Sequence, residues 1–168
     1  MCARAWEDLQ VAEARFQIRL AREEDRVPMA VLFATVAEER DGIGTEPPVD
    51  VEARAASWTL DGTFVADADS EILGSMHVDV SRHGYGEVNM VVAREWRGRG
   101  VGSALLAAAI DWARGRGLHK LSLSVWPHNA AAIALYRKYG FVEEGRRVKQ
   151  MRRQSGELWD VVDMGLLL

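Results

Sequence analysis

The chain has 168 residues, of which 48% are hydrophobic and 27% are charged. This length corresponds to about one domain of ~150 residues. The composition is that of a soluble globular protein and excludes disordered, collagen-like and membrane classes. The longest nearly apolar run, Val101–Ile110, is about half of the ~20 residues that a membrane-spanning helix needs. We expect a single domain over residues 15–168, preceded by a tail or short helix at residues 1–14.

The cysteine content and the beginning of the chain both bear on its location. Cys2 is the only cysteine, so no disulfide can form within the chain, and a reducing compartment is expected. The first twenty residues interleave charged with apolar side chains and lack the continuous apolar run of a signal peptide. The sequence therefore predicts a cytoplasmic protein.

Charge is distributed unevenly along the chain. Residues 1–95 carry a net charge of −10 and residues 96–168 a net charge of +6, which gives −4 overall. The pattern indicates one cationic and one anionic ligand, although two solvated faces would produce it as well. We expect neither a nucleic-acid nor a membrane partner, because the overall balance is acidic and no nucleic-acid motif is present. The four histidines lack metal-ligand spacing, so no metal is expected.

The first part of the chain predicts a strand, two helices and then three strands. Apolar and polar residues alternate over 16–20, as in a half-buried strand. Acidic residues at 23–25 open a helix that continues to Val36, a loop rich in Gly and Pro covers 41–50, and a second helix covers 51–60. The three strands that follow are predicted over residues 63–68, 72–80 and 87–92.

The second part predicts a helix, a strand, a helix and a closing hairpin. The run after Gly102 is rich in Ala and Leu and ends at Gly115 and Gly117. A strand at 121–125 is followed by a helix that Asn129 caps. The hairpin is predicted over residues 141–153 and 158–167. This order of elements predicts an α/β protein with a mixed sheet flanked by helices.

The most informative motif is Arg97-Gly98-Arg99-Gly100-Val101-Gly102, between a predicted strand and a predicted helix. Its glycines let the backbone approach a ligand closely, and the helix that follows offers unpaired N–H groups to a phosphate or pyrophosphate. A P-loop would require a lysine before Ser103, and a dinucleotide fingerprint would require glycine at that position. Both of these patterns therefore fail.

The remaining pattern, Arg-x-x-Gly-x-Gly, resembles that of the GNAT superfamily of acyl-CoA-dependent N-acyltransferases. A second motif supports the resemblance, because residues 129–141 are similar to the family's Asn-x-x-Ala-x-x-Leu-Tyr-x-x-x-Gly-Phe stretch. The two motifs occur in the family's order, and the matching elements extend from Phe16 to Leu167. The resemblance implies a mostly antiparallel mixed sheet of about seven strands, splayed between the fourth and fifth strands.

The resemblance also implies roles for particular residues. In the family, pantetheine pairs with the strand before the glycine loop, the loop holds the pyrophosphate, and an asparagine and a tyrosine on the next helix contact the cofactor. The tyrosine protonates the departing thiolate. The acetyl-CoA-binding residues implied here are Met90, Val91, Val92, Arg97, Gly98, Arg99, Gly100, Val101, Gly102, Ser103, Asn129 and Tyr136.

Several of these residues have simpler explanations. Asn129 is explained by helix capping alone as well as by capping with a cofactor contact. Tyr136 could pack beside its neighbours with a locally bonded hydroxyl, although the motif favours the catalytic role. Arg97 and Arg99 could be surface charges, although their position beside the glycine loop favours anion contacts.

The chemistry of amine acetylation requires a base. A lysine-type amine with a pKa of ~10.4 needs roughly 4–5 kcal/mol to lose its proton at pH 7, whereas an α-amine near 8 needs about 1 kcal/mol. Glu87, at the start of the predicted cofactor strand, is the candidate, although it could equally be a solvated acid at the strand end. With Cys2 as the only cysteine, direct transfer in a ternary complex is favoured over an acyl-enzyme route.

The two charge cues to the acceptor disagree. Glu38, Glu39 and Glu46 lie near the loop at 41–50, which in the family forms part of the acceptor wall, and they favour a cationic acceptor. The basic run at 146–153 in the hairpin favours a carboxylate-bearing amine such as an amino acid, unless it only guards an exposed strand edge.

These observations predict an N-acetyltransferase that moves an acetyl group from acetyl-CoA to a primary amine of a small molecule or a peptide N-terminus. The alternatives are an acyl-CoA-binding sensor of the same fold without turnover, and a nucleotide-binding module that uses the glycine loop alone. A homodimer through the closing strands is a further expectation.

Overall fold

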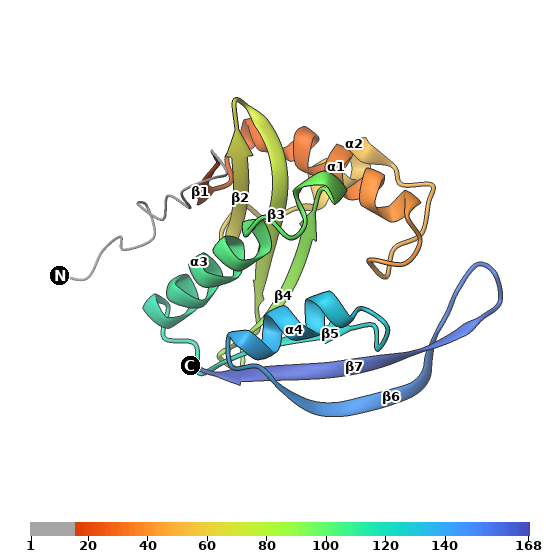
Figure 1. The fold of residues 1–168 in the computed structure, drawn as a ribbon. Helices are drawn as coiled ribbons and strands as arrows, with labels where there is room; N and C mark the ends of the chain where they lie inside the picture. The colour runs from red at the N-terminus through yellow and green to blue at the C-terminus, as the bar shows by residue number, and fades with distance from the viewer. Residues whose placement is uncertain (1–15) are drawn as a thin grey trace. The chain divides into compact units, whose positions relative to one another are not determined.

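The computed structural model describes residues 16–168, so Cys2 and the predicted tail at 1–14 lie outside the described residues. The chain forms seven strands and four α-helices within this part (Figure 1). Two short 3₁₀ turns, Glu23–Asp25 and Arg94–Trp96, precede α1 and the glycine loop. The elements are β1 (Gln17–Leu20), α1 (Arg26–Glu38), α2 (Val51–Ser57), β2 (Thr63–Ala68), β3 (Glu71–Val80), β4 (Tyr85–Val92), α3 (Val101–Gly115), β5 (Lys120–Val125), α4 (Ala130–Lys138), β6 (Val142–Arg152) and β7 (Leu158–Leu167).

The order of elements agrees with the sequence prediction, and the differences concern the ends. The helix α2 ends at Ser57, because Trp58 has an extended backbone with φ −79° and ψ 135°. Arg26 explains this end, since its guanidinium donates to the backbone oxygens of Ala55 and Trp58. The strand β4 begins two residues earlier than predicted, at Tyr85, and α3 begins at Val101 inside the glycine motif.

The sheet has the strand order β1-β2-β3-β4-β5-β7-β6. The pairs β1–β2, β2–β3, β5–β7 and β6–β7 are antiparallel, whereas β4 and β5 are parallel. The parallel register consists of three pairs, the last of which joins Glu87 to Ser122, although β4 continues to Val92 and β5 to Val125. This confirms the predicted mixed sheet that is splayed between its fourth and fifth strands.

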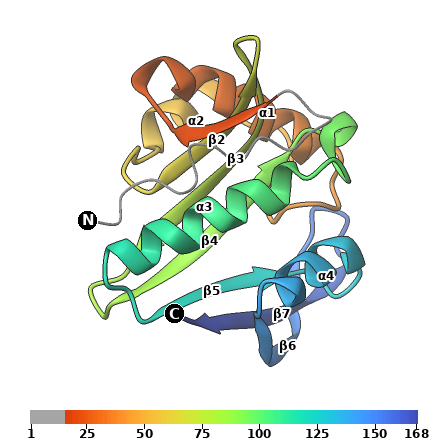
Figure 2. The same cartoon turned by 60° about the vertical axis from the view of Figure 1, so that its left-hand side comes forward.

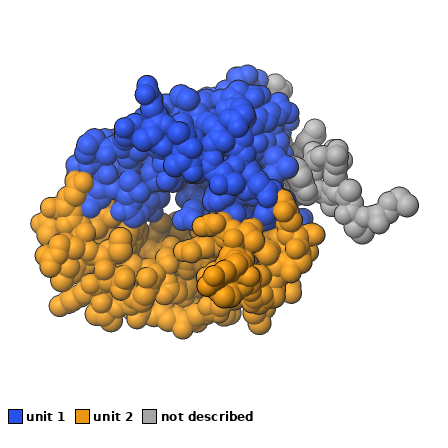
Figure 3. All heavy atoms as spheres, turned by 180° about the vertical axis from the view of Figure 1, so that it is seen from behind, with its two compact units in different colours: residues 1–78, 89–112 blue, residues 79–88, 113–168 orange. Residues whose placement is uncertain are grey.

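The chain divides into two compact units, which Figure 3 shows in blue and orange. Within the described residues, unit 1 comprises 16–78 and 89–112, and unit 2 comprises 79–88 and 113–168. The strand β4 therefore contributes residues to both units.

Unit 1 is built on β1, β2, most of β3 and the second half of β4. Met29 of α1 packs in one cluster with Val65 of β2 and Val91 of β4. Phe64, the neighbour of Val65, contacts Trp112 of α3 edge to face, with ring centroids 6.3 Å apart. Neighbouring residues of a strand point to opposite faces, so α1 and α3 cover opposite faces of β2 (Figure 1 and Figure 2).

The helix α3 approaches the sheet closely at Gly74 of β3. A Cβ atom at this position would lie 3.0 Å from Val101 and 3.1 Å from Leu105 of α3, and 3.1 Å from the carbonyl oxygen of Val91. A side chain at Gly74 would therefore push the first turn of α3 away from β4, and this fixes where the glycine loop meets the sheet.

Unit 2 is built on β5, β6 and β7 with α4. Phe141 is 2% exposed and contacts Tyr136 of α4 with ring centroids 5.7 Å apart. The edge strand β6 is exposed along its whole length. None of the helices within residues 16–168 is both long and apolar enough to cross a membrane.

Candidate functional site

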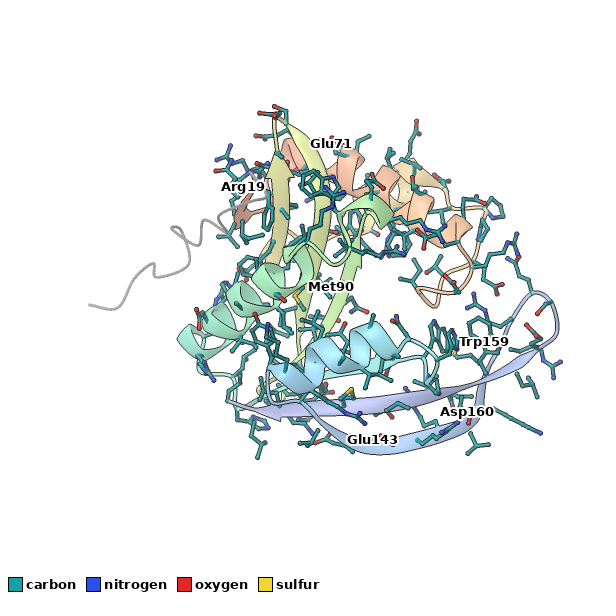
Figure 4. All side chains as sticks on the ribbon, viewed as in Figure 1. Arg19, Glu71, Met90, Glu143, Trp159 and Asp160 are labelled. Carbon is teal, nitrogen blue, oxygen red and sulfur yellow. The ribbon has the colours of Figure 1, made fainter. Side chains whose placement is uncertain are left out.

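The strand β4 carries the first group of predicted cofactor residues. Val91 is buried in the core cluster of unit 1, whereas Met90 and Val92 are partly exposed (Figure 4 labels Met90). On the side opposite β3, no strand within residues 16–168 pairs with the stretch from Val88 to Val92. The backbone N–H and C=O groups on that side are available to an extended ligand, which would complete the pairing of the strand.

The glycine loop between β4 and α3 has a backbone conformation that needs glycine. Gly98 and Gly100 have φ of 72° and 89°, and a Cβ atom built at either position meets no heavy atom within 4 Å. The first bond of α3 runs from the N–H of Ala104 to the oxygen of Gly100, at 2.9 Å. Open space beside the loop and the N-terminal end of a 15-residue helix fit the phosphate groups of a ligand.

The two arginines of the loop differ in what they contact. Arg97 donates to both carboxylate oxygens of Glu39, at 2.7 and 2.9 Å, and its Nε donates to the oxygen of Val92 at 3.0 Å. It thereby ties the loop to α1 and β4. Arg99 is exposed and lies 5.4 Å from the ring centroid of Trp96, and it forms no ion pair with any described residue. Arg99 is therefore the loop cation that is available to a phosphate.

Asn129 begins the helix α4 as predicted. Its side-chain oxygen accepts a hydrogen bond from the N–H of Ala132 at 3.2 Å, which satisfies one of the unpaired donors of the first turn. The capping role is confirmed, and the additional cofactor contact stays a prediction.

Tyr136 is held in place by the packing of its buried ring. The residue is 8% exposed, and burial raises the pKa of Tyr136 to about 12, so the hydroxyl keeps its proton at neutral pH. No other group in residues 16–168 forms a hydrogen bond with this hydroxyl. The structure thus contains a buried aromatic ring whose O–H donor is uncommitted.

Glu87 lies on β4 opposite Ser122, at the last pair of the parallel register. Its side chain is exposed and has no ion-pair partner among the described residues, so its carboxylate is in contact with water. Glu87 belongs to unit 2, as do Asn129 and Tyr136. Unit 1 contains both the end of β4, from Met90 onward, and the glycine loop. Glu87 precedes Met90 by three residues on the same strand.

Some of the charged residues that gave conflicting cues to the acceptor are paired with residues of opposite charge. Glu39 binds Arg97, and Glu46 lies 4.0 Å from Arg40. In the hairpin, Arg146 and Arg147 bind acids of β7 at 2.8 and 2.7 Å, namely Asp160 and Asp163 (Figure 4 labels Asp160). Two of the five basic residues of the run are therefore paired with acids within their own hairpin.

Arg54 was missed from the sequence, and Arg153 was predicted only as a member of the basic run, without its aromatic neighbours. Arg153 is 3% exposed and lies 4.5 Å from the ring centroid of Trp159 and 5.4 Å from that of Trp126. Arg54 lies over Phe33 and Trp58. The only available signal for Arg54 was the spacing of four residues to Trp58, which would place both side chains on one face of the helix predicted over 51–60.

The comparisons with known proteins agree with this arrangement. The sequence profile of the Acetyltransferase (GNAT) family matches residues 30–141. Phosphinothricin N-acetyltransferase of Streptomyces coelicolor is 31% identical over 163 residues, which cover 88% of this chain and 94% of that one. The crystal structure of ribosomal-protein-alanine N-acetyltransferase from Brucella melitensis has a TM-score of 0.81 and 30% identity, covering 90% of this chain and 99% of that chain.

Other curated relatives extend beyond the part that matches this chain. The L-amino acid N-acetyltransferase AaaT of Escherichia coli is 34% identical over 109 residues, which cover 60% of this chain and 65% of that one. The match with a second relative covers only 32% of the length of that relative.

Within residues 16–168, no three His, Cys, Asp or Glu side chains lie close enough together to form a metal site. The matched profile, the splayed sheet and the glycine loop together show that the chain belongs to the Acetyltransferase (GNAT) family.

Proposed function

We propose that the protein transfers an acetyl group from acetyl-CoA to a primary amine, by direct attack of the amine in a ternary complex. The observation that carries the proposal is the parallel register of β4 and β5, which ends at Glu87 while β4 continues to Val92. The unpaired backbone of β4 is followed directly in the sequence by the glycine loop. The pantetheine of acetyl-CoA can therefore bind along β4 while its pyrophosphate binds at the loop.

In this proposal the thioester is bound by backbone groups. The stretch from Met90 to Val92 offers the pantetheine the backbone groups on its side opposite β3, and one N–H group on that side polarises the thioester carbonyl. Gly98 to Ser103 hold the pyrophosphate, with Arg99 as the available cation, and Asn129 contributes a contact to the pantetheine. The open space beside Gly98 and Gly100 supports this assignment.

The amine must lose a proton before it attacks. Glu87 accepts it, directly or through a water molecule, since its exposed carboxylate has no ion-pair partner among the described residues. The α-amine of a peptide N-terminus needs only about 1 kcal/mol to lose its proton at pH 7, whereas a lysine-type amine needs roughly 4–5 kcal/mol. The exposed position of Glu87 therefore suits an α-amine better.

The sulfur gains negative charge as its bond to the acetyl carbon breaks. Tyr136 is the donor to this sulfur, because its hydroxyl is protonated and uncommitted. Its pKa of about 12 lies above the ~8.5 of an ordinary thiol, so complete proton transfer is uphill and the hydroxyl acts by donating a hydrogen bond to the departing thiolate. The second proton of the amine then neutralises the thiolate.

We infer that the acceptor is an α-amine, as in an amino acid or a peptide N-terminus. The name of one relative, an L-amino acid N-acetyltransferase, supports this class. The pairing of Glu39 with Arg97 removes part of the evidence for a polycationic acceptor. The cytoplasmic location and the homodimer through the closing strands remain part of the proposal.

The first test is the release of free thiol from acetyl-CoA with amino acids, peptides, polyamines and aminoglycosides, against a control without acceptor. We expect turnover with α-amines. Tight binding of acetyl-CoA without turnover of any acceptor would favour the acyl-CoA sensor, and a preference for ATP or NAD over CoA would favour the nucleotide-binding module.

The role of Tyr136 is tested by Tyr136→Phe, with Tyr139→Phe on the same helical segment as its matched control. We expect Tyr136→Phe to lower kcat by about 10²-fold with little change in the Kd of acetyl-CoA. Tyr139→Phe should retain nearly full activity. Equal activity of the two variants would remove the donor role of Tyr136.

The glycine loop is tested by Gly100→Glu, with Gly117→Glu as its matched control. Both glycines have positive φ, of 89° and 71°, and open surroundings, so both variants add the same strain and the same charge. Only Gly100 lies beside the proposed pyrophosphate. We expect Gly100→Glu to abolish binding of acetyl-CoA and Gly117→Glu to preserve it.

A further inference from the structure

Arg54 is held over two aromatic rings in unit 1. Its guanidinium carbon lies 4.0 Å from the ring centroid of Phe33 in α1 and 4.8 Å from that of Trp58, which follows α2. The two rings meet edge to face at an interplanar angle of 86° and a centroid distance of 6.1 Å. This arrangement, which we call the aromatic shelf, comprises Phe33, Arg54 and Trp58. It places the guanidinium against both rings.

The charge of Arg54 is not compensated by any residue of the part 16–168 that the structure describes. No carboxylate of the described residues forms an ion pair with it, and none of its side-chain N–H groups has a hydrogen-bond acceptor there. Its Nε is buried without a partner, and burial lowers the pKa of Arg54. The terminal nitrogens are not among the buried unpaired atoms, so they face solvent. A partly desolvated cation with an open edge is suited to a planar oxyanion, which it can bind through two parallel hydrogen bonds.

The aromatic shelf adjoins the strand expected to hold the cosubstrate. Phe33 and Trp58 pack against the core cluster of unit 1 that contains Val91, the middle residue of the proposed pantetheine stretch. Ile43, from the loop expected to form part of the acceptor wall, packs against the same cluster. One hydrophobic cluster thus connects the uncompensated cation, the acceptor loop and the cofactor strand.

We propose that Arg54 binds the carboxylate of the acceptor and thereby selects α-amino acids. This inference rests on the proposed acetyl transfer to an amine. The amine of the acceptor would be placed by the carboxylate at its other end, while Phe33 and Trp58 prevent the guanidinium from rotating. Amines without a carboxylate would leave the desolvated charge of Arg54 uncompensated.

The test compares each of four L-amino acids with its own carboxamide, namely alanine, methionine, phenylalanine and glutamate. Each pair presents the same side chain and an α-amine, and the two members differ in the carboxylate. The ratio of the kcat/KM values of acid and amide is measured for the native protein and for Arg54→Gln, Arg54→Lys and Arg82→Gln. Arg82 is exposed and lies on the β3–β4 turn in unit 2, so Arg82→Gln is the matched control for loss of a positive charge.

We expect the native protein to favour the acid by about 10- to 100-fold, the contribution of a charge-assisted bidentate contact. Arg54→Gln should lose this preference through a higher KM for the acid, with the KM of acetyl-CoA and the activity on amides unchanged. Arg54→Lys should recover only part of it, since an ammonium cannot form the planar fork. Arg82→Gln should retain the native ratio.

The outcomes separate this inference from the proposed function. Turnover of amides equal to that of acids in the native protein, or an Arg54→Gln variant that keeps the preference, would overturn the role of Arg54 and leave the acetyltransferase intact. Turnover of amines without a carboxylate but of no amino acid would also overturn it. Failure to acetylate any amine, with Arg54 in place, would overturn the proposed function itself.

Discussion

Two arginines of unit 1 occupy opposite chemical situations. Arg19 of β1 lines a cavity of about 840 Å³ and binds two carboxylates, those of Asp25 and Asp67 (Figure 4 labels Arg19). Gln17 donates to Asp67 at 2.9 Å, and the N–H of Arg22 donates to Asp25 at 2.7 Å. Arg54 has aromatic rings on its faces and no carboxylate among the described residues.

The difference shows why the size of a cavity is a poor guide to a ligand site. The two carboxylates already neutralise Arg19, so the cavity beside β1 offers an anion no uncompensated charge. The hydrogen bonds with Asp25 raise the pKa of Arg19, whereas burial lowers the pKa of Arg54. We therefore regard the first arginine as structural and the second as available to a ligand.

The largest expected effect comes from Arg19→Met. The side chains of Asp25 and Asp67 are only 5% and 9% exposed, and the substitution leaves both without their cation. We expect a loss of about 3–5 kcal/mol in the free energy of unfolding, or roughly 6–20 °C in Tm at this chain length, measured by circular dichroism. Arg22→Met, which removes an exposed arginine 3.7 Å from Glu24, is the control and should cost less than about 1 kcal/mol. Equal losses of unfolding free energy in Arg19→Met and Arg22→Met would contradict the structural role of Arg19.

Acid should weaken the Arg19 cluster before it affects the aromatic shelf. The hydrogen bond from Arg19 lowers the pKa of Asp25 in the folded state, so Asp25 contributes its full stabilisation above the unfolded pKa of about 3.9. That contribution declines as the pH falls below this value through the folded pKa. We expect Tm to drop more steeply below about pH 4 in the native protein than in Arg19→Met. Parallel curves would assign the acid sensitivity to other groups.

A third arginine, Arg97, is intermediate, because it is paired with Glu39 but is 41% exposed. Glu39→Gln should cost about 0.5–1 kcal/mol of stability. It should also release Arg97 toward the proposed pyrophosphate and tighten binding of acetyl-CoA about two- to fivefold, by isothermal titration calorimetry. Weaker binding in Glu39→Gln would mean that Arg97 serves only to tie the loop to α1 and β4.

The smallest effect is expected for Arg54→Met. The lost contact with the rings is offset by removal of a desolvated charge, so the free energy of unfolding in urea should change by less than about 1 kcal/mol. A loss of more than about 2 kcal/mol would identify Arg54 as structural, like Arg19.

Local patterns in the sequence predicted the elements well, because their signals are local. Asn129 caps α4 as its residue type indicates. Gly98 and Gly100 of the motif have positive φ, whereas Gly102 lies within α3. The end of α2 was placed three residues late, since Arg26 from a distant helix binds the carbonyl of Trp58. Such a partner leaves no trace in the periodicity of α2 itself.

Sequence motifs indicated some residues of the proposed site and gave no signal for others. The residues of the glycine loop and of α4 are adjacent in sequence and follow family motifs. The aromatic shelf depends on Phe33 meeting Arg54 across two helices, and pairing between helices cannot be read from either one. Asp25 was interpreted as one of three acids at a helix start, but its carboxylate binds Arg19 of β1. In both cases tertiary contacts decide the role of a charged residue.

The alternation of the two units along the chain has a consequence for synthesis and for protein engineering. Residues 79–88 of unit 2 are inserted between the two segments of unit 1. A cut at any single point therefore leaves at least one unit in two pieces, so split-protein reporters or domain exchanges built on this chain require complementation of both fragments. On the ribosome, unit 1 is incomplete until residue 112 has emerged, and the β4 residues of unit 2 must wait for β5, with which they pair.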